Sequence, residues 1–193
     1  MKIRSIFFAA ASALALASCG GKVSDMTQIS GTVASEEVTE VRVQSGDLDT
    51  LVTVTEGKFS LDIPADLNVY ASIKASGADF YAMFIPDGTP LTVTLAEESS
   101  VTSKYPEISV QEKLNVYETG LKTLMDEYSS TRKKIYSDSI MTKEEMDGKF
   151  EIFYDEFSER YKAHHLDACA ANTDNFVSVI AMSSLRGQVE DAE

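Results

Sequence analysis

Apolar and polar residues alternate in short runs between residues 27 and 105. The run "ISGTV" puts Ile29, Gly31 and Val33 on one side of a strand, and "LTVTL" (91–95) repeats the pattern. Turn residues such as Pro86-Asp87-Gly88 separate the runs, because proline presets φ and glycine tolerates positive φ. Roughly seven short strands at this spacing predict a small antiparallel β-sandwich or open barrel over residues 27–105.

Two stretches in this region carry more detailed expectations. In "LVTVTEGKFSLDI" (51–63), a two-residue turn at Glu56-Gly57 would oppose Val54 to Phe59 and Val52 to Leu61, which keeps the apolar side chains on one face. A three-residue loop would mix the faces, so the two-residue hairpin is favoured. The runs "VYASI" (69–73) and "FYAMFI" (80–85) are evenly apolar, which predicts strands buried on both faces or at a sheet centre.

The pattern changes to a helical period after Pro106. Ser109 with Glu112, and Thr142 with Glu145, have the spacing of capping boxes and predict two helix starts. Apolar residues then recur three and four apart along each helix: Leu114, Tyr117, Leu121, Leu124 and Tyr128, followed by Met146, Phe150, Phe153, Phe157 and Tyr161. Gly120 should weaken the first helix by about 1 kcal/mol relative to alanine.

Residues 106–193 are therefore expected to form a helical region. The short connection "SDSIM" (137–141) predicts an antiparallel helical hairpin, and a short third helix is expected from about residue 174 to residue 185. The predicted fold class is α+β, with the β-domain first and the helices after it.

The N-terminus has the pattern of a secretory signal peptide over residues 1–18. Lys2 and Arg4 precede an apolar run from residue 6 to residue 17, which is shorter than the roughly 20 residues that span a bilayer. The order Leu16-Ala17-Ser18-Cys19 resembles the lipobox of bacterial lipoproteins. That resemblance implies cleavage before Cys19, a diacylglyceryl group on its thiol, acylation of its new amine, and a lipidated tether over residues 19–26. The alternative is an ordinary signal peptide in which the cysteine stands by chance.

The net charge and the number of cysteines exclude some partners and some redox chemistry. The chain has 17 basic and 31 acidic residues, a net charge of −14. Without Lys2 and Arg4, 15 basic residues stand against 31 acidic ones, so the net charge is near −16 and nucleic acid is not an expected partner. If Cys19 carries lipid, only Cys169 remains, which excludes an intramolecular disulfide and a C-x-x-C redox pair. Cys169 is expected to be a small buried thiol rather than a reactive one.

Few residues suggest chemistry. His164 and His165 are adjacent, so on a helix they point about 100° apart and cannot both face one metal; we expect a solvated pair. Asp47 and Asp49 could bind calcium weakly, but the EF-hand pattern is missing and a turn is expected. The sequence contains no catalytic, phosphate-binding or dinucleotide-binding motif, so no catalytic residue, metal site or cofactor is predicted.

Three aromatic residues are the candidates for a binding groove. Phe80, Tyr81 and Phe84 lie close together in one predicted strand, although aromatic residues at strand spacing are more often part of the core. Both interpretations stay open.

The order of these segments resembles a family of Bacteroidota lipoproteins. A lipobox, "ISGTV", "TEGKFSLDIP", "MFIPDGTPLTVTL" and an amphipathic helical segment follow one another over about residues 19–185. The matching positions are Gly31, the hairpin residues Gly57-Lys58-Phe59, and the turn Asp87-Gly88. Typical members carry an N-terminal β-domain of unknown function, a helical linker, and then a thioredoxin-like domain of the thiol-disulfide oxidoreductase class.

The resemblance implies a cell-envelope protein whose redox domain is missing here. In the family the redox chemistry belongs to a C-x-x-C in the later domain, and the chain stops where that domain would begin; neither Cys19 nor Cys169 corresponds to a catalytic cysteine. We therefore expect a lipid-anchored, non-catalytic accessory or interaction module with a possible envelope protein partner. The alternatives are the front portion of a thiol-disulfide oxidoreductase and a ligand-binding lipoprotein. Since no acidic cluster follows Cys19, the resemblance favours the periplasmic face of the outer membrane.

Overall fold

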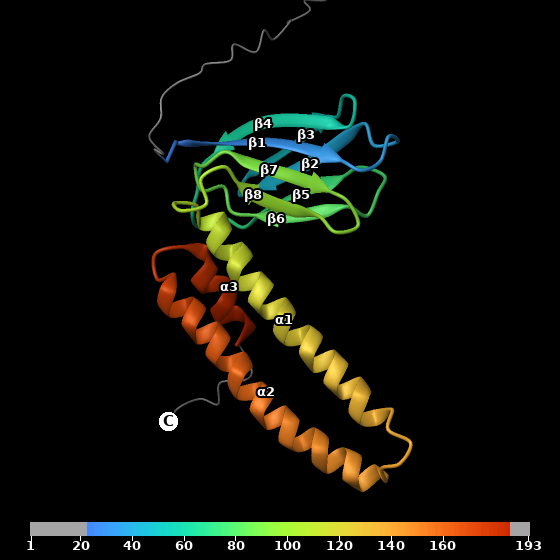
Figure 1. Cartoon of the computed structure of the whole chain (residues 1–193). Coiled ribbons are helices and arrows are strands. Elements are labelled where there is room, and N and C mark those ends of the chain that lie inside the picture. Colours follow the sequence, from blue (N-terminus) through green and yellow to red (C-terminus); the bar gives the residue numbers. More distant parts are fainter. Residues whose placement is uncertain (1–22, 186–193) are drawn as a thin grey trace, which may run out of the picture.

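The computed structural model describes residues 23–185, and this part of the chain has an α+β fold (Figure 1). The strands form two four-stranded sheets. The first sheet contains, in spatial order, β4 (Lys58–Pro64), β1 (Met26–Val33), β7 (Leu91–Leu95) and β8 (Ser100–Ser103). The second contains β3 (Leu48–Thr53), β2 (Glu40–Ser45), β5 (Ala71–Ala75) and β6 (Tyr81–Phe84). The signal peptide and the lipobox predicted from the sequence lie outside the described residues.

The two sheets pack against each other around one hydrophobic core. Ile29 and Val93 from the first sheet and Val41 and Ile73 from the second belong to the same cluster of buried side chains. All neighbouring strands are antiparallel except β1 and β7, which run parallel. The predicted fold class is confirmed as an open, antiparallel-rich pair of sheets. The parallel pair was not anticipated, because strand neighbours distant in sequence leave no local signal.

The turn at Glu56-Gly57 is confirmed, but the hairpin around it is shorter than predicted. Thr55 and Lys58 exchange two backbone hydrogen bonds of 2.8 and 3.0 Å, and both turn residues have positive φ. Beyond this bridge the strands separate, since β3 pairs with β2 while β4 pairs with β1. The predicted opposition of Val52 and Leu61 is therefore wrong: the turn joins two sheets instead of two neighbours in one sheet.

Gly31 is explained by its cross-strand neighbour. Gly31 of β1 lies opposite Phe59 of β4, and a Cβ on Gly31 would stand 2.0 Å from the Phe59 ring. Because the aromatic ring covers the glycine, the pair fills the core as one unit. The early-strand glycine and the hairpin phenylalanine of the sequence pattern thus serve one packing contact.

The prediction for the two evenly apolar runs holds for one of them. β5 is an inner strand between β2 and β6, as expected. β6 is the edge strand of its sheet, so the prediction of a central strand over residues 80–85 is wrong. Its residues alternate between the core, where Ala82 and Phe84 are buried, and the outer side, which carries Tyr81 and Met83.

Three helices follow the sheets: α1 (Val110–Tyr136), α2 (Lys143–Ala171) and α3 (Phe176–Ser184). Ser109 and Thr142 cap α1 and α2 as predicted. The second capping box is complete, whereas Glu112 accepts a hydrogen bond from the backbone N–H of Ser103 instead of returning to Ser109. The first predicted capping box is thus only half right. Ser109 caps the helix, but the Glu112 side chain does not bond back to Ser109, because it connects α1 to β8 instead.

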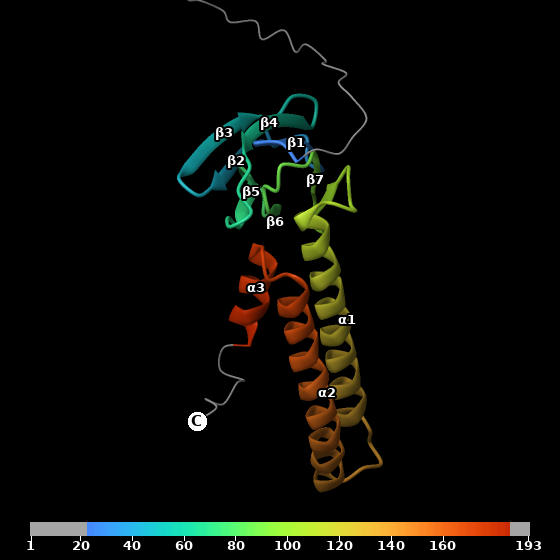
Figure 2. The same cartoon turned by 90° about the vertical axis from the view of Figure 1, so that its left-hand side faces the viewer.

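The helices extend away from the sheets as a long hairpin (Figure 1). α3 packs against one face of this hairpin at the end near the sheets, and no other helix or strand of residues 23–185 lies on the rest of that face (Figure 2). Six buried side chains form the joint core of this region: Ile85, Val110, Leu114, Tyr117, Val177 and Ala181. The hairpin and the third helix are confirmed. Among residues 23–185, no helix combines the length and the apolar character needed to cross a bilayer.

Candidate functional site at the junction of sheets and helices

The predicted lipidation site cannot be placed in the structure. Leu16, Ala17, Ser18 and Cys19 all lie outside residues 23–185. Their role in lipid attachment stays a prediction from the sequence. The described part offers a different candidate, at the junction between the sheets and α1.

This junction is built around the buried carboxylate of Asp87. One carboxylate oxygen accepts hydrogen bonds from the backbone N–H and the hydroxyl of Thr89, at 2.9 and 2.6 Å. The other accepts from the Ser109 hydroxyl at 2.6 Å and from the backbone N–H of Gln111 at 3.0 Å. Since Ser109 and Gln111 begin α1, the acidic side chain also lies at the positive end of the helix dipole. Asp87 therefore fastens α1 to the turn after β6.

Gln111 makes the reciprocal contact from the helix. Its side-chain oxygen accepts from the backbone N–H of Ile85 at 2.8 Å, and its amide nitrogen donates to Asn115 at 2.9 Å. Gly88, at the same turn, has a φ of +79° and donates its N–H to the Thr27 hydroxyl at 2.8 Å. The orientation of α1 relative to the sheets is thus held by hydrogen bonds on both sides of the junction.

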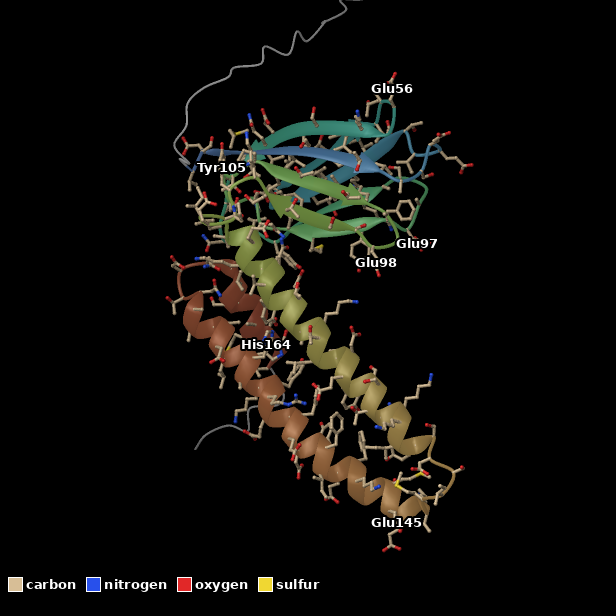
Figure 3. All side chains as sticks on the ribbon, viewed as in Figure 1. Glu56, Glu97, Glu98, Tyr105, Glu145 and His164 are labelled. Atoms are coloured by element: carbon tan, nitrogen blue, oxygen red, sulfur yellow. The ribbon has the colours of Figure 1, made fainter. Side chains whose placement is uncertain are left out.

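A hollow of about 450 Å³ opens beside this junction, between β6, the β7–β8 loop and α1. Glu97 and Glu98 lie on that loop, at the edge of the sheets that faces the helices (Figure 3). The polar and aromatic side chains that line the hollow are Tyr70, Asp79, Tyr81, Glu97, Glu98, Ser99, Gln111, Asn115 and Glu118. The lining comes from segments that are far apart in the sequence.

The hollow is acidic and aromatic. The Tyr70 hydroxyl donates a hydrogen bond to Glu118 at 3.2 Å. Burial, and then the nearby Glu118 charge, hold the pKa of Tyr70 well above its ordinary value, so this hydroxyl stays protonated. Partial burial also raises the pKa of Glu118, while the hydrogen bond from Tyr70 opposes that rise. Carboxylates repel anions and tyrosine rings attract cations, so such a lining favours neutral or cationic ligands over anions.

The three aromatic candidates do not share one surface. Phe84 is fully buried in the core between the sheets, and Phe80 packs against that core. Tyr81 is exposed and lines the hollow. Successive residues of a strand point to opposite faces, which separates Tyr81 from its aromatic neighbours. Only Tyr81 of the three is therefore positioned to contact a ligand there.

The expectation of a solvated histidine pair is wrong. His165 is completely buried, and its Nδ1 lies 2.8 Å from the Tyr117 hydroxyl. His164 is half-buried between α1 and α2 (Figure 3), where its Nε2 lies 2.9 Å from the Tyr117 carbonyl oxygen. Both rings face α1, because the two histidines straddle the line along which the helices meet. The pair holds the hairpin together.

The remaining candidates have structural roles. The Cys169 thiol is half-buried, donates to the Ser178 carbonyl oxygen at 3.6 Å, and has its pKa raised by burial, which disfavours the reactive thiolate. Asp49 forms an ion pair with Arg42 on neighbouring strands. Within residues 23–185, no three histidine, cysteine or acidic side chains are grouped so that they could hold a metal ion.

The sequence did not reveal the junction, although it marked several of its parts. Pro86-Asp87-Gly88 was predicted as a turn and Ser109 as a helix cap. Nothing in the sequence indicated that the Asp87 carboxylate accepts hydrogen bonds from both the turn and the helix start. Comparison with known proteins adds no family: no protein-family model matches the chain, and no curated protein matches it.

Proposed function

We propose that the chain is a lipid-anchored module of the cell envelope that acts through binding a protein partner, on the periplasmic side of the outer membrane. The sequence supports the anchor, because a charged start, a short apolar run and Leu16-Ala17-Ser18-Cys19 follow one another. Three acyl chains would attach the protein to the membrane permanently, since two already hold a protein stably. The resemblance to Bacteroidota lipoproteins favours the same location.

One observation supports the binding role more than any other: within the described residues, a large part of the helical hairpin contains no fully buried side chain. Between Leu121 on α1 and Phe153 on α2, no side chain is buried. Nevertheless this part carries aromatic residues that contact one another, including Tyr128 with Phe150 and Phe153. An amphipathic hairpin usually buries such residues against a further layer. A protein partner would supply that layer.

Membrane fractionation tests the anchor. The full-length protein should sediment with membranes, and Cys19→Ala should move it to the soluble fraction. Cys169→Ala is the matched control, since this thiol lies within the helical region, and it should stay with the membranes. A Cys19→Ala protein that remains membrane-bound would overturn the proposed anchor. Protease treatment of intact cells tests the side: protection is expected, and complete digestion would place the protein on the cell surface.

The hollow at the junction favours a second candidate function, the binding of a small neutral or cationic ligand. Its volume is in the range of ligand sites, and Tyr81 offers an exposed ring beside carboxylates. Calorimetric titration with oligosaccharides and with basic peptides tests this function. Tyr81→Ala should weaken binding at least about tenfold, whereas Tyr105→Ala, outside the lining, should leave it unchanged. No binding of either probe class at millimolar concentration would count against this function.

A further inference from the structure

Two of the four edge strands carry no charged residue. The edge strands are β4 and β8 in the first sheet and β3 and β6 in the second. β4 contains Lys58 and Asp62, and β3 contains Asp49, whereas β8 ("SVTS") and β6 ("YAMF") are uncharged. Charges on an edge strand discourage pairing with another chain. β6 and β8 are therefore open to pairing with a further strand wherever nothing covers them.

The start of α1 covers β8 and one end of β6. Glu112 and Asn115 form hydrogen bonds with backbone groups on the outer edge of β8. Gln111 accepts in the same way from the backbone N–H of Ile85, the residue directly after β6, at 2.8 Å. Side chains of one helix thus take the place of a neighbouring strand, but only where the helix begins.

The rest of the β6 edge keeps its backbone groups unpaired. The N–H of Ala75 on β5 donates to the Phe80 carbonyl oxygen at 2.9 Å, and bonded and non-bonded pairs alternate along an antiparallel ladder. Tyr81 and Met83 therefore direct their N–H and C=O groups away from β5, as Ile85 does. Within residues 23–185 these four groups form no hydrogen bond to another residue.

The hollow lies along this uncovered part of β6. Tyr81, Ala82 and Met83 line one side of it, and Ser99 and Val101 line another. A strand added to β6 would run about 4.8 Å from it, and four of its residues would extend about 13 Å. The open space is thus on the side of β6 where a fifth strand of the second sheet would run.

The charge of the hollow selects the kind of strand that fits. Four acidic side chains line it: Asp79, Glu97, Glu98 and Glu118. Glu97 and Glu98 lie at the edge of the sheets that faces the helices (Figure 3). Among the described residues, no lysine or arginine belongs to the lining; Lys74 lies one strand away on β5. Complementary charge favours a basic segment and disfavours an acidic one.

We propose that an extended basic segment of a protein partner pairs with β6 as a fifth strand of the second sheet. Its backbone forms hydrogen bonds with Tyr81 and Met83, and its lysine or arginine side chains lie among the carboxylates of the hollow. The hollow is at the base of α1, so a partner that lies along the helical hairpin reaches β6 with one segment (Figure 1). This inference rests on the proposed function and deepens it, because it names the chemistry of the partner's bound segment.

Fluorescence anisotropy with the detergent-purified full-length protein tests the binding. The probe is a labelled, capped seven-residue peptide of alternating lysine and valine, and the control peptide has glutamate in place of lysine. The basic peptide should bind with a dissociation constant of about 10–500 μM, and the acidic peptide at least about tenfold more weakly. Raising the salt concentration from about 50 to about 500 mM should weaken the basic peptide at least about threefold, because salt screens the charges.

Substitutions on two edge strands separate backbone pairing from attraction between charges. Met83→Pro removes one outward N–H and puts a ring in the way of an added strand, so it should weaken binding at least about tenfold. Met83→Ala keeps the N–H and should weaken binding less than about threefold. Leu51→Pro is the matched control, because Leu51 has the same outward position on β3, at the other edge of the sheet, and it should leave the affinity unchanged.

Amide hydrogen exchange followed by NMR needs no substitution, and it decides the question if Met83→Pro does not fold. The basic peptide should slow exchange at Tyr81 and Met83 at least about tenfold and leave Leu51 unchanged. The inference is overturned if the basic peptide does not bind at about 1 mM, if the acidic peptide binds equally well, or if binding protects neither amide. It is also overturned if a folded Met83→Pro binds as well as Leu51→Pro. Cys19→Ala should bind the peptide like the wild type, so failure of the anchor is detected separately from failure of the strand pairing.

Discussion

Gly120 and His164 fit together across the line where α1 meets α2. A Cβ on Gly120 would stand 2.5 Å from Cε1 of the His164 ring. The same ring stacks on Tyr117, with centroids 5.2 Å apart, and bonds to the Tyr117 carbonyl oxygen. The glycine costs helix propensity, but it makes room for a side chain that joins the two helices.

Gly120→Ala should therefore destabilise the protein by about 1 kcal/mol, although alanine is the better helix former. In a His164→Ala background the same change should instead stabilise by about 0.5–1 kcal/mol, because the obstructing ring is gone. Urea unfolding of the four proteins measures both effects. Gly148→Ala in α2 is the control: nothing lies near its would-be Cβ, so stabilisation by about 1 kcal/mol is expected. Equal effects of Gly120→Ala in both backgrounds would contradict this account.

His165 makes stability depend on pH. Burial, and then the neighbouring His164, lower the pKa of His165 below its ordinary value of 6.5. Its Nδ1 faces Tyr117 of α1, the Tyr161 ring stands over it, and its Nε2 is buried without a hydrogen-bond partner. Ser184 of α3 and Cys169 of α2 complete the surroundings of the Tyr117 hydroxyl, so no acidic group in direct contact would compensate a charge on the ring.

The native state therefore binds fewer protons at His165 than the unfolded chain does. Its contribution to stability is complete above pH 6.5 and is lost as the pH falls below that value toward the lowered pKa. The melting temperature of the wild type should accordingly fall more between pH 7.5 and pH 5 than that of His165→Gln. Calorimetric scans at several pH values measure the difference. Parallel curves for the two proteins would show that His165 does not carry this dependence.

At the scale of elements, Asp87 is the contact on which the joint between the β-sheets and α1 depends most. It lies in the turn after β6, and it accepts hydrogen bonds from its own turn and from the first residues of the helix. Because the carboxylate is buried, its removal leaves several buried donors without an acceptor.

Asp87→Ala should lower the free energy of unfolding by about 3 kcal/mol. Asp87→Asn keeps one acceptor oxygen and should cost less. Chemical denaturation measures both changes, and Asp47→Ala in the exposed β2–β3 turn serves as the control, with an expected change below about 0.5 kcal/mol. A loss below about 1 kcal/mol for Asp87→Ala would mean that the apolar cluster around Leu114 holds the joint without it.

The sequence predicted the helices, strands and turns better than it predicted which of them lie next to each other. Helix starts at Ser109 and Thr142 followed from residues three apart, and the turn at Glu56-Gly57 followed from two adjacent residues, so local signals were sufficient. The separation of β3 from β4 and the edge position of β6 depend on pairing between distant strands, which no local pattern records. The hollow was missed for the same reason, since Tyr70, Tyr81 and Glu118 come from separate segments.

At the scale of the whole molecule, the protein consists of a closed core between two sheets and an open helical hairpin attached to it (Figure 1). The apolar side chains between the two sheets share one buried core, whereas the helices carry exposed apolar side chains such as Met125, Tyr154 and Val179. This difference suggests that the sheets hold the helices in place and that the helices make the contacts. The proposed anchor at Cys19 would keep those contacts at a membrane.

Mass spectrometry of the mature protein purified from membranes tests the central claim, that this module is anchored through Cys19. The account predicts an N-terminal peptide that begins at Cys19 and carries the added mass of a diacylglyceryl group and an N-linked acyl chain. A mature N-terminus elsewhere, or an unmodified thiol at Cys19, would contradict the account.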